Sequence, residues 1–228
     1  MASGLSMKAP RLVVPAYFHP AVAPHDWAAL AALPEVRLVV LNVADGPGER
    51  PEPAFADVLA TLDEAGVAVA GYVDTDYGQR TDRAIRADVD RYRSWYPQVR
   101  AAFFDRVAAD QELVARYRRV ARTARAAGLG TVVFNHGVHP VPAYAEHADL
   151  LGTFEGPWSA YRTLQVPAWA RSAPRERFLH LVHSVPVRSL PAARRLVASR
   201  HAGAAYVTDL PGRPGENPYR RLPAGAAP

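Results

Sequence analysis

Residues 100–106 read Arg100-Ala101-Ala102-Phe103-Phe104-Asp105-Arg106, an apolar run that ends in a carboxylate and a cation. A short apolar run of this kind is typical of a buried strand. A carboxylate at the rim of a core costs stability unless it has a partner or a function, so Asp105 is the first candidate for a functional residue. The arginine that follows, Arg106, determines which chemistry Asp105 can carry out.

On both sides of this stretch, short apolar runs rich in β-branched residues alternate with longer amphipathic runs. The predicted strands are 12–18, 36–42, 67–73, 100–105, 130–135, 150–155, 177–183 and 204–208. The predicted helices are 26–33, 53–65, 80–95, 110–127, 141–147, 158–164 and 190–200. Alternation of this kind along 228 residues predicts a single (β/α)8 TIM barrel, whose active site lies at the carboxyl ends of the strands.

A doubly wound open sheet is the alternative architecture for alternating strands and helices. It predicts a glycine-rich, phosphate-binding turn after the first strand, whereas this chain has Tyr17-Phe18-His19-Pro20 there. We predict that the barrel domain spans residues 11–210. A flexible leader at 1–10 and a loose, Gly- and Pro-rich tail at 211–228 are expected to flank it.

The net charge of +5 comes almost wholly from arginine, and one cluster lies at positions 116, 118, 119, 122 and 125. These arginines alternate with apolar residues at helical spacing, which indicates the solvated face of an amphipathic helix. No nucleic-acid partner is therefore expected. The sequence has no feature that sets an oligomeric state.

The chain contains no cysteine, and its histidines show neither His-x-His nor His-Glu-x-x-His spacing. We therefore expect no metal, no cofactor and no disulfide. No apolar run approaches the roughly 18 residues of a membrane span, so no membrane partner is expected. The first residues lack the apolar segment of a signal peptide, which predicts a cytoplasmic protein, or a secreted one if a signal peptide has been removed.

Polar side chains gather where the predicted strands end. Asp105 and Glu155 each end an apolar strand, and we predict that they are the catalytic pair of a glycosidase, because cleavage of a glycosidic bond needs two carboxyl groups. Either acid could instead cap a helix or pair with an arginine. A sugar also needs polar groups for its hydroxyls and aromatic rings for its C–H faces. The predicted substrate-binding residues are Tyr17, His19, Asn42, Asp74, Tyr77, Arg106, Asn135, His136 and Trp158.

Motifs in the first two thirds of the chain carry a family resemblance. They include Val14-Pro15-Ala16-Tyr17, Asn42-Val43-Ala44-Asp45-Gly46-Pro47-Gly48, Gly71-Tyr72-Val73-Asp74-Thr75-Asp76-Tyr77-Gly78-Gln79-Arg80, Phe103-Phe104-Asp105 and Phe154-Glu155. In these motifs the chain resembles the spherulin-4, or spherulation-specific family 4, proteins, which include a glycoside hydrolase group acting on galactosaminogalactan. The resemblance implies a (β/α)8 barrel, an open cleft for an amino-sugar polysaccharide, and catalytic acids at Asp105 and Glu155.

The chain departs from the family pattern at two places. Arg106 stands where the family's characterised hydrolases have glutamate, and Asn42-Val43-Ala44-Asp45 replaces the usual Asn-Pro-x-Asn. Arg106 either turns away from the cleft, as strand alternation favours, or faces it and holds Asp105 ionised. In the second case Asp105 is a base, nucleophile or cation stabiliser, and Glu155 is the proton donor.

The sequence therefore predicts a glycoside hydrolase that acts on an amino-sugar-containing or related polysaccharide, with an oligosaccharide or polysaccharide as its partner. A non-catalytic carbohydrate-binding barrel is the alternative, because Arg106 replaces an acid. In a third interpretation, Arg106 together with His19 and His136 binds an anionic sugar or a phosphate.

Overall fold

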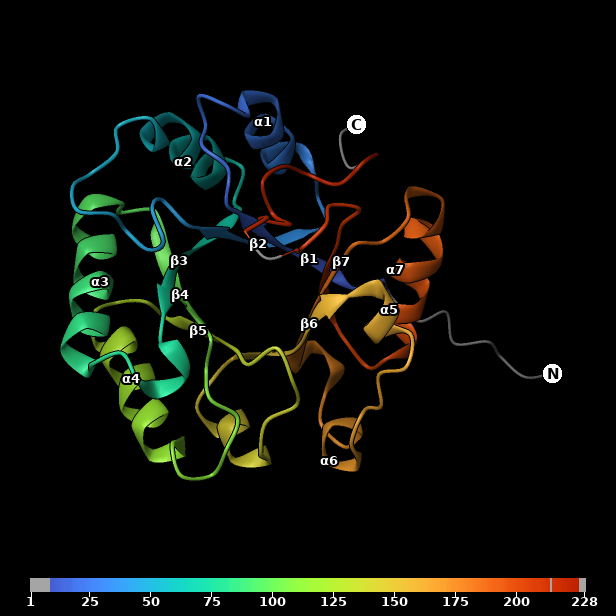
Figure 1. Ribbon diagram of the computed structural model, residues 1–228. Coiled ribbons are helices and arrows are strands. Elements are labelled where there is room, and N and C mark those ends of the chain that lie inside the picture. Colours follow the sequence, from blue (N-terminus) through green and yellow to red (C-terminus); the bar gives the residue numbers. More distant parts are fainter. Residues whose placement is uncertain (1–8, 214, 226–228) are drawn as a thin grey trace.

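The computed structural model describes residues 9–213 and 215–225. Parallel strands close into a barrel in the order β1 to β8, and β8 pairs with β1 (Figure 1). This arrangement confirms the predicted (β/α)8 TIM barrel. Residues 1–8 of the predicted leader lie outside the described residues.

The strands of the barrel are β1 (Arg11–Ala16), β2 (Val36–Leu41), β3 (Ala68–Asp74), β4 (Val99–Asp105), β5 (Thr131–Asn135), β6 (Leu150–Pro157), β7 (Phe178–His183) and β8 (Ala204–Val207). The α-helices are α1 (Pro24–Ala32), α2 (Phe55–Glu64), α3 (Asp82–Trp95), α4 (Val114–Ala126), α5 (Trp158–Tyr161), α6 (Ala168–Arg171) and α7 (Leu190–Ser199). Short 3-10 helices are η1 (Asp76–Gly78), η2 (Pro142–Glu146), η3 (Arg175–Arg177) and η4 (Val187–Ser189).

Local sequence explains where these elements begin and end. The strands are apolar and buried along most of their length, because helices cover the outer face and side chains fill the inside. Thr81 caps α3 by accepting a hydrogen bond of 3.2 Å from the backbone N–H of Ala84. Gly66 and Gly128 end α2 and α4 at φ values of 71° and 88°, which a side chain would disfavour.

Two predicted helices do not form as full α-helices in the structure. The helix expected at 141–147 is the 3-10 helix η2, because Pro142 holds Val141 in an extended conformation and few residues remain before β6. The helix expected at 158–164 ends as an α-helix at Tyr161 and continues as turns, in which Thr163 and Leu164 donate to carbonyls three residues earlier.

The described chain has no α-helix after β8, where a (β/α)8 barrel has its eighth. Residues 215–225, here called the C-terminal segment, take that place and run beside α1 (Figure 1, red beside blue). The predicted loose tail needs correction, because Tyr219 and Leu222 are only 4% and 5% exposed and pack into the core. Two large apolar side chains therefore hold this segment on the barrel.

No helix in residues 9–213 and 215–225 is both long and apolar enough to cross a membrane.

Candidate active site

The two predicted acids lie on either side of one amide group. Asp105 ends β4, Asn135 ends β5 and Glu155 lies on β6, so adjacent strands deliver the three side chains to the same end of the barrel. The amide nitrogen of Asn135 donates to Oδ1 of Asp105 at 2.7 Å and to Oε2 of Glu155 at 2.5 Å. Because both bonds share one nitrogen, these two oxygens are separated by at most the sum of the two lengths, 5.2 Å.

Two tyrosines complete the hydrogen bonding of the acids. The hydroxyl of Tyr72 donates to Oδ2 of Asp105 at 2.9 Å, and the hydroxyl of Tyr219 donates to Oε1 of Glu155 at 2.7 Å. The ring of Tyr17 lies edge-on to both tyrosines, at centroid distances of 5.4 and 5.5 Å. All four carboxylate oxygens therefore accept a hydrogen bond from a neutral donor.

A glycine makes room for the bridging amide. A Cβ on Gly152 of β6 would lie 2.2 Å from Oδ1 of Asn135 and 3.0 Å from its Cα. Any side chain at position 152 would therefore displace Asn135 from between the acids. The same amide oxygen is buried without a hydrogen-bond partner in the structure, so packing and the two donor bonds fix the orientation of Asn135.

Burial raises the pKa of both acids. Burial first, and then the negative charge of Asp105, raise the pKa of Glu155 to about 7. Burial also raises the pKa of Asp105, although the hydrogen bonds from Asn135 and Tyr72 oppose this effect. Two carboxylates this close resist ionising together, so the pair retains one proton near neutral pH.

The side chain of Arg106 binds carboxylates other than the acid pair. Its backbone has a φ of 49°, and its guanidinium forms a bidentate pair with Asp74, in which Nε lies 2.8 Å from Oδ1. A second ion pair joins it to Asp76 at 3.0 Å. These contacts hold the pKa of Asp74 below its usual range, against its burial. Two carboxylates thus occupy the guanidinium, which argues against the predicted role of Arg106 in binding an anionic sugar.

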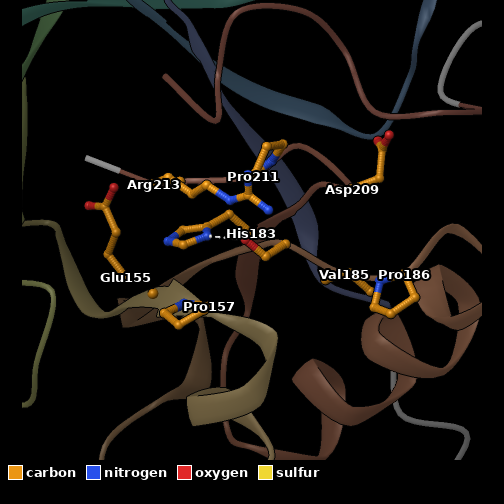
Figure 2. Close-up of a pocket in the computed structure, with 11 residues that line it drawn as sticks. Glu155, Pro157, His183, Val185, Pro186, Asp209, Pro211 and Arg213 are labelled. Atoms are coloured by element: carbon orange, nitrogen blue, oxygen red, sulfur yellow. Dashed lines mark hydrogen bonds between the residues drawn. The ribbon is translucent and has the colours of Figure 1, made fainter. Parts of the chain in front are cut away.

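A cavity of about 650 Å³ opens beside Glu155. Its walls come from the ends of β6 and β7 and from the residues after β8, and they include His183, Asp209 and Arg213. Figure 2 shows Glu155 and Asp209 on opposite sides of this space, with His183 and Arg213 between them. Because Glu155 borders the cavity and also binds Asn135, a ligand in the cavity can reach the acid pair.

Among the predicted site residues, the structure brings together Asp105, Glu155, Asn135 and Tyr17, with Asp74 next to them on β3. Tyr77 lies on the rim, 54% exposed, with the guanidinium of Arg106 5.8 Å from its ring centroid. An exposed ring at the mouth of the barrel is suited to stacking on a sugar.

The other residues predicted to contact substrate bind other parts of the barrel, not the acid pair. His136 packs edge-on against Tyr144, and its Nδ1 lies 2.8 Å from the carbonyl of Ala108, so its prediction as a substrate contact needs correction. Strand alternation explains this, because Asn135 points inward and the next residue cannot.

The described contacts of the three remaining predicted residues also lie outside the acid pair. His19 packs edge-on against Phe55, and Trp158 stacks on Tyr161. Oδ1 of Asn42 accepts a hydrogen bond of 2.8 Å from the backbone of Gly46 and so orders the loop after β2. None of the three has a described hydrogen bond to the acid pair.

Sequence reasoning missed Tyr72 and Tyr219 as site residues. Tyr72 is two positions before Asp74 on β3, so strand alternation places both side chains on the same face and could have identified it. Tyr219 lies in a Gly- and Pro-rich stretch without periodicity, and no sequence pattern connects it to Glu155. No group of three or more His, Asp or Glu side chains in the described part of the chain is arranged to hold a metal ion.

Comparisons with known proteins agree on one family. The family model described as "Spherulation-specific family 4" matches residues 11–226. Spherulin-4 of Physarum polycephalum is 28% identical over 211 residues, which are 87% of this chain and 63% of that protein. The chain therefore spans less than two thirds of the length of this curated relative.

Solved structures agree with the fold. The crystal structure of Aspergillus clavatus Sph3 in complex with GalNAc matches with a TM-score of 0.80 and 25% identity, over 95% of this chain and 94% of that one. A truncated 3-deoxy-D-arabino-heptulosonate 7-phosphate synthase from Thermotoga maritima matches with a TM-score of 0.50 and 12% identity, over 96% and 82% of the two chains. The second likeness shows the shared barrel alone.

Proposed function

The chain belongs to spherulation-specific family 4, and from that premise we propose that it is a glycoside hydrolase that cleaves a polysaccharide containing an amino sugar. The observation that carries this proposal is the bridge from Asn135 to both Asp105 and Glu155. It holds two carboxyl groups side by side at the carboxyl ends of the strands, where (β/α)8 barrels have their active sites.

The spacing of the acids supports a retaining mechanism. Retaining glycosidases hold their two carboxyl groups about 5–5.5 Å apart, whereas inverting enzymes leave roughly 6.5–9.5 Å for a water molecule. The bridged oxygens are at most 5.2 Å apart, the sum of the two bonds to the Asn135 nitrogen. One acid then attacks the anomeric carbon, and the other first donates a proton to the leaving oxygen and later accepts one from water.

The environments of the acids support distinct roles. Burial and the charge of Asp105 raise the pKa of Glu155 to about 7, so this carboxyl retains its proton up to near-neutral pH. It also borders the cavity, so we assign it as the general acid and base. Asp105 receives hydrogen bonds from Asn135 and Tyr72, which favour its charged form, so we assign it as the nucleophile.

Two observations support an amino sugar as the ligand: the sugar bound to a related protein, and the side chains exposed at the rim of this barrel. The Aspergillus clavatus structure contains GalNAc, which supports an N-acetylgalactosamine-type sugar as the unit recognised here. Tyr77 offers an exposed ring for a sugar face, and the ionised Asp74 offers acceptors for hydroxyl or amino hydrogens.

A non-catalytic carbohydrate-binding barrel is the second candidate. It is favoured by Arg106, which stands where the characterised hydrolases of the family have glutamate and which is fully engaged with Asp74 and Asp76. In this case the cleft binds a glycan, and the acids serve as hydrogen-bonding groups.

Release of reducing ends from a polysaccharide containing N-acetylgalactosamine tests the first proposal. We expect Asp105→Asn and Glu155→Gln each to lose about 10²- to 10⁴-fold in rate. Asp90→Asn is the matched control, because Asp90 is an exposed helix residue that pairs with Arg86 at 3.6 Å. Product formed first as the same anomer as the substrate supports retention.

Equal rates in the wild type and both acid variants contradict the hydrolase proposal. If the wild type releases nothing but binds an N-acetylgalactosamine oligosaccharide by calorimetry, the binding barrel is supported. Absence of both hydrolysis and binding across a glycan panel contradicts both candidates.

A further inference from the structure

The C-terminal segment is fixed to the mouth of the barrel by several separate contacts. The backbone N–H groups of Leu222 and Ala224 donate to Asp26 of α1 at 3.2 Å and to Asp209 at 2.9 Å. The side-chain amide of Asn217 donates to the carbonyl of Tyr17 at 3.1 Å. These bonds connect the segment to the residue after β1, to a residue after β8 and to helix α1.

Tyr219 is oriented within this segment from two sides. Its backbone N–H donates to Oδ1 of Asn217 at 2.7 Å, which sets the turn that leads into it. Its ring lies edge-on to Tyr17 at a centroid distance of 5.5 Å and against Tyr206 at 5.9 Å. The hydroxyl is thus aimed at Glu155, with 2.7 Å between the two oxygens.

We propose that Tyr219 is a positioning residue, whose hydroxyl fixes the Glu155 carboxyl beside the cavity, so that the C-terminal segment completes the site begun by the strands. This inference rests on the proposed function for its catalytic meaning. The bond itself is present whatever reaction the site performs.

Two opposing influences act on Glu155. Burial and the charge of Asp105 on β4 favour its protonated form, whereas the hydrogen bonds from Tyr219 and Asn135 favour its charged form. Tyr17, after β1, also lies close enough for its own titration to respond to both acids. His183 of β7, together with Asp209 and Arg213 after β8, lines the cavity beside Glu155. Without the Tyr219 hydroxyl, the Glu155 carboxyl has one bond fewer to hold its orientation and its charge.

The variant Tyr219→Phe removes the hydroxyl and keeps the ring. Tyr206→Phe is the matched control, because Tyr206 touches the Tyr219 ring but directs its hydroxyl to the carbonyl of Arg221 at 3.3 Å. Carbon-13 NMR of protein labelled at glutamate carboxyl carbons follows the titration of Glu155, which Glu155→Gln assigns. We expect the Glu155 midpoint to rise by about one pH unit in Tyr219→Phe and to stay in place in Tyr206→Phe.

Kinetics give an independent measurement. In Tyr219→Phe we expect kcat to fall about 10- to 100-fold with KM changed less than about threefold, and the alkaline limb of the rate profile to move up with the Glu155 midpoint. An unchanged Glu155 titration in Tyr219→Phe, or an equal shift in Tyr206→Phe, overturns the inference. If the titration shifts as expected while the wild type hydrolyses no glycan, the proposed function fails and the positioning role stands.

Discussion

Arg106 binds Asp74, not Asp105, the residue beside it in the chain. The left-handed backbone at Arg106, with a φ of 49°, turns its side chain across the end of β3. Asp74 would otherwise add its negative charge to the acid pair next to it, and the guanidinium offsets that charge. The arginine therefore belongs to the rim of the barrel and leaves Asp105 and Glu155 as neighbours.

Charge reversal at this position tests the rim ion pairs. In Arg106→Glu, three carboxylates meet where a bidentate pair stood, so we expect the free energy of unfolding to fall by about 1–3 kcal/mol, less at high salt. Chemical denaturation at low and high salt measures this change. Arg86→Glu is the control, since Arg86 pairs with Asp90 at 3.6 Å on an exposed helix face and should change stability by less than about 0.5 kcal/mol. Equal losses in the two variants would contradict a special role for Arg106.

Removal of the bridging amide tests the acid pair. In Asn135→Ala, both carboxylates lose a donor and the bridge between them is removed, so we expect hydrolysis to slow by about 10²- to 10³-fold. His136→Gln, at the adjacent outward position, can still donate to the carbonyl of Ala108 and should retain activity within about threefold. Initial rates on the same glycan measure both variants. A strong loss in His136→Gln with little change in Asn135→Ala would reverse this assignment.

The space beside the bridging amide is tested with a single methyl group. In Gly152→Ala, the new Cβ would lie 2.2 Å from Oδ1 of Asn135, so we expect a loss of about 1–3 kcal/mol in stability and a lower hydrolysis rate. Gly130→Ala is the control, because a Cβ at Gly130 meets nothing within 4 Å. Thermal denaturation and initial rates compare the two. If Gly152→Ala keeps its stability and its hydrolysis rate, Asn135 can move without loss of the site.

The titration of Glu155 predicts a pH dependence of stability. Its pKa rises from the ordinary value of 4.5 to about 7 in the folded protein, so between these values the folded state keeps a proton that the unfolded state has lost. The free energy of unfolding contributed by this group therefore falls as pH rises through that range, by roughly 3 kcal/mol in total. Relative to Glu155→Gln, the wild type should lose that amount between pH 4.5 and 7.5.

The comparison between wild type and Glu155→Gln is needed because two buried histidines change stability with pH in the opposite direction. Burial lowers the pKa of His136 to about 4 and that of His180 to about 3, and both effects make the protein more stable as pH rises. These histidines are the same in wild type and Glu155→Gln, so their contribution cancels in the difference. Denaturation curves that stay parallel from pH 4.5 to 7.5 would contradict the raised pKa of Glu155.

Sequence periodicity predicted most of the barrel and the placement of Asp105 and Glu155 at the same end of it. Asp105 lies at the end of β4 and Glu155 near the end of β6, so the positions of the apolar strands were enough to bring them to one end of the barrel. The direction of Arg106 was left open, because a left-handed residue just after a strand breaks the alternation on which such predictions depend. Tyr219 was missed because its place depends on long-range contacts with Tyr17, Asp26 and Asp209, which leave no local pattern in the sequence.

Because no described residue after β8 forms an α-helix, a segment made late in synthesis completes the site. All eight strands, and with them Asp105, Asn135 and Glu155, precede Tyr219 in the sequence. On the ribosome, the barrel strands therefore emerge before the residue that binds Glu155. The contact between Tyr219 and Glu155 can therefore form only after residue 219 has been synthesised and the C-terminal segment has docked.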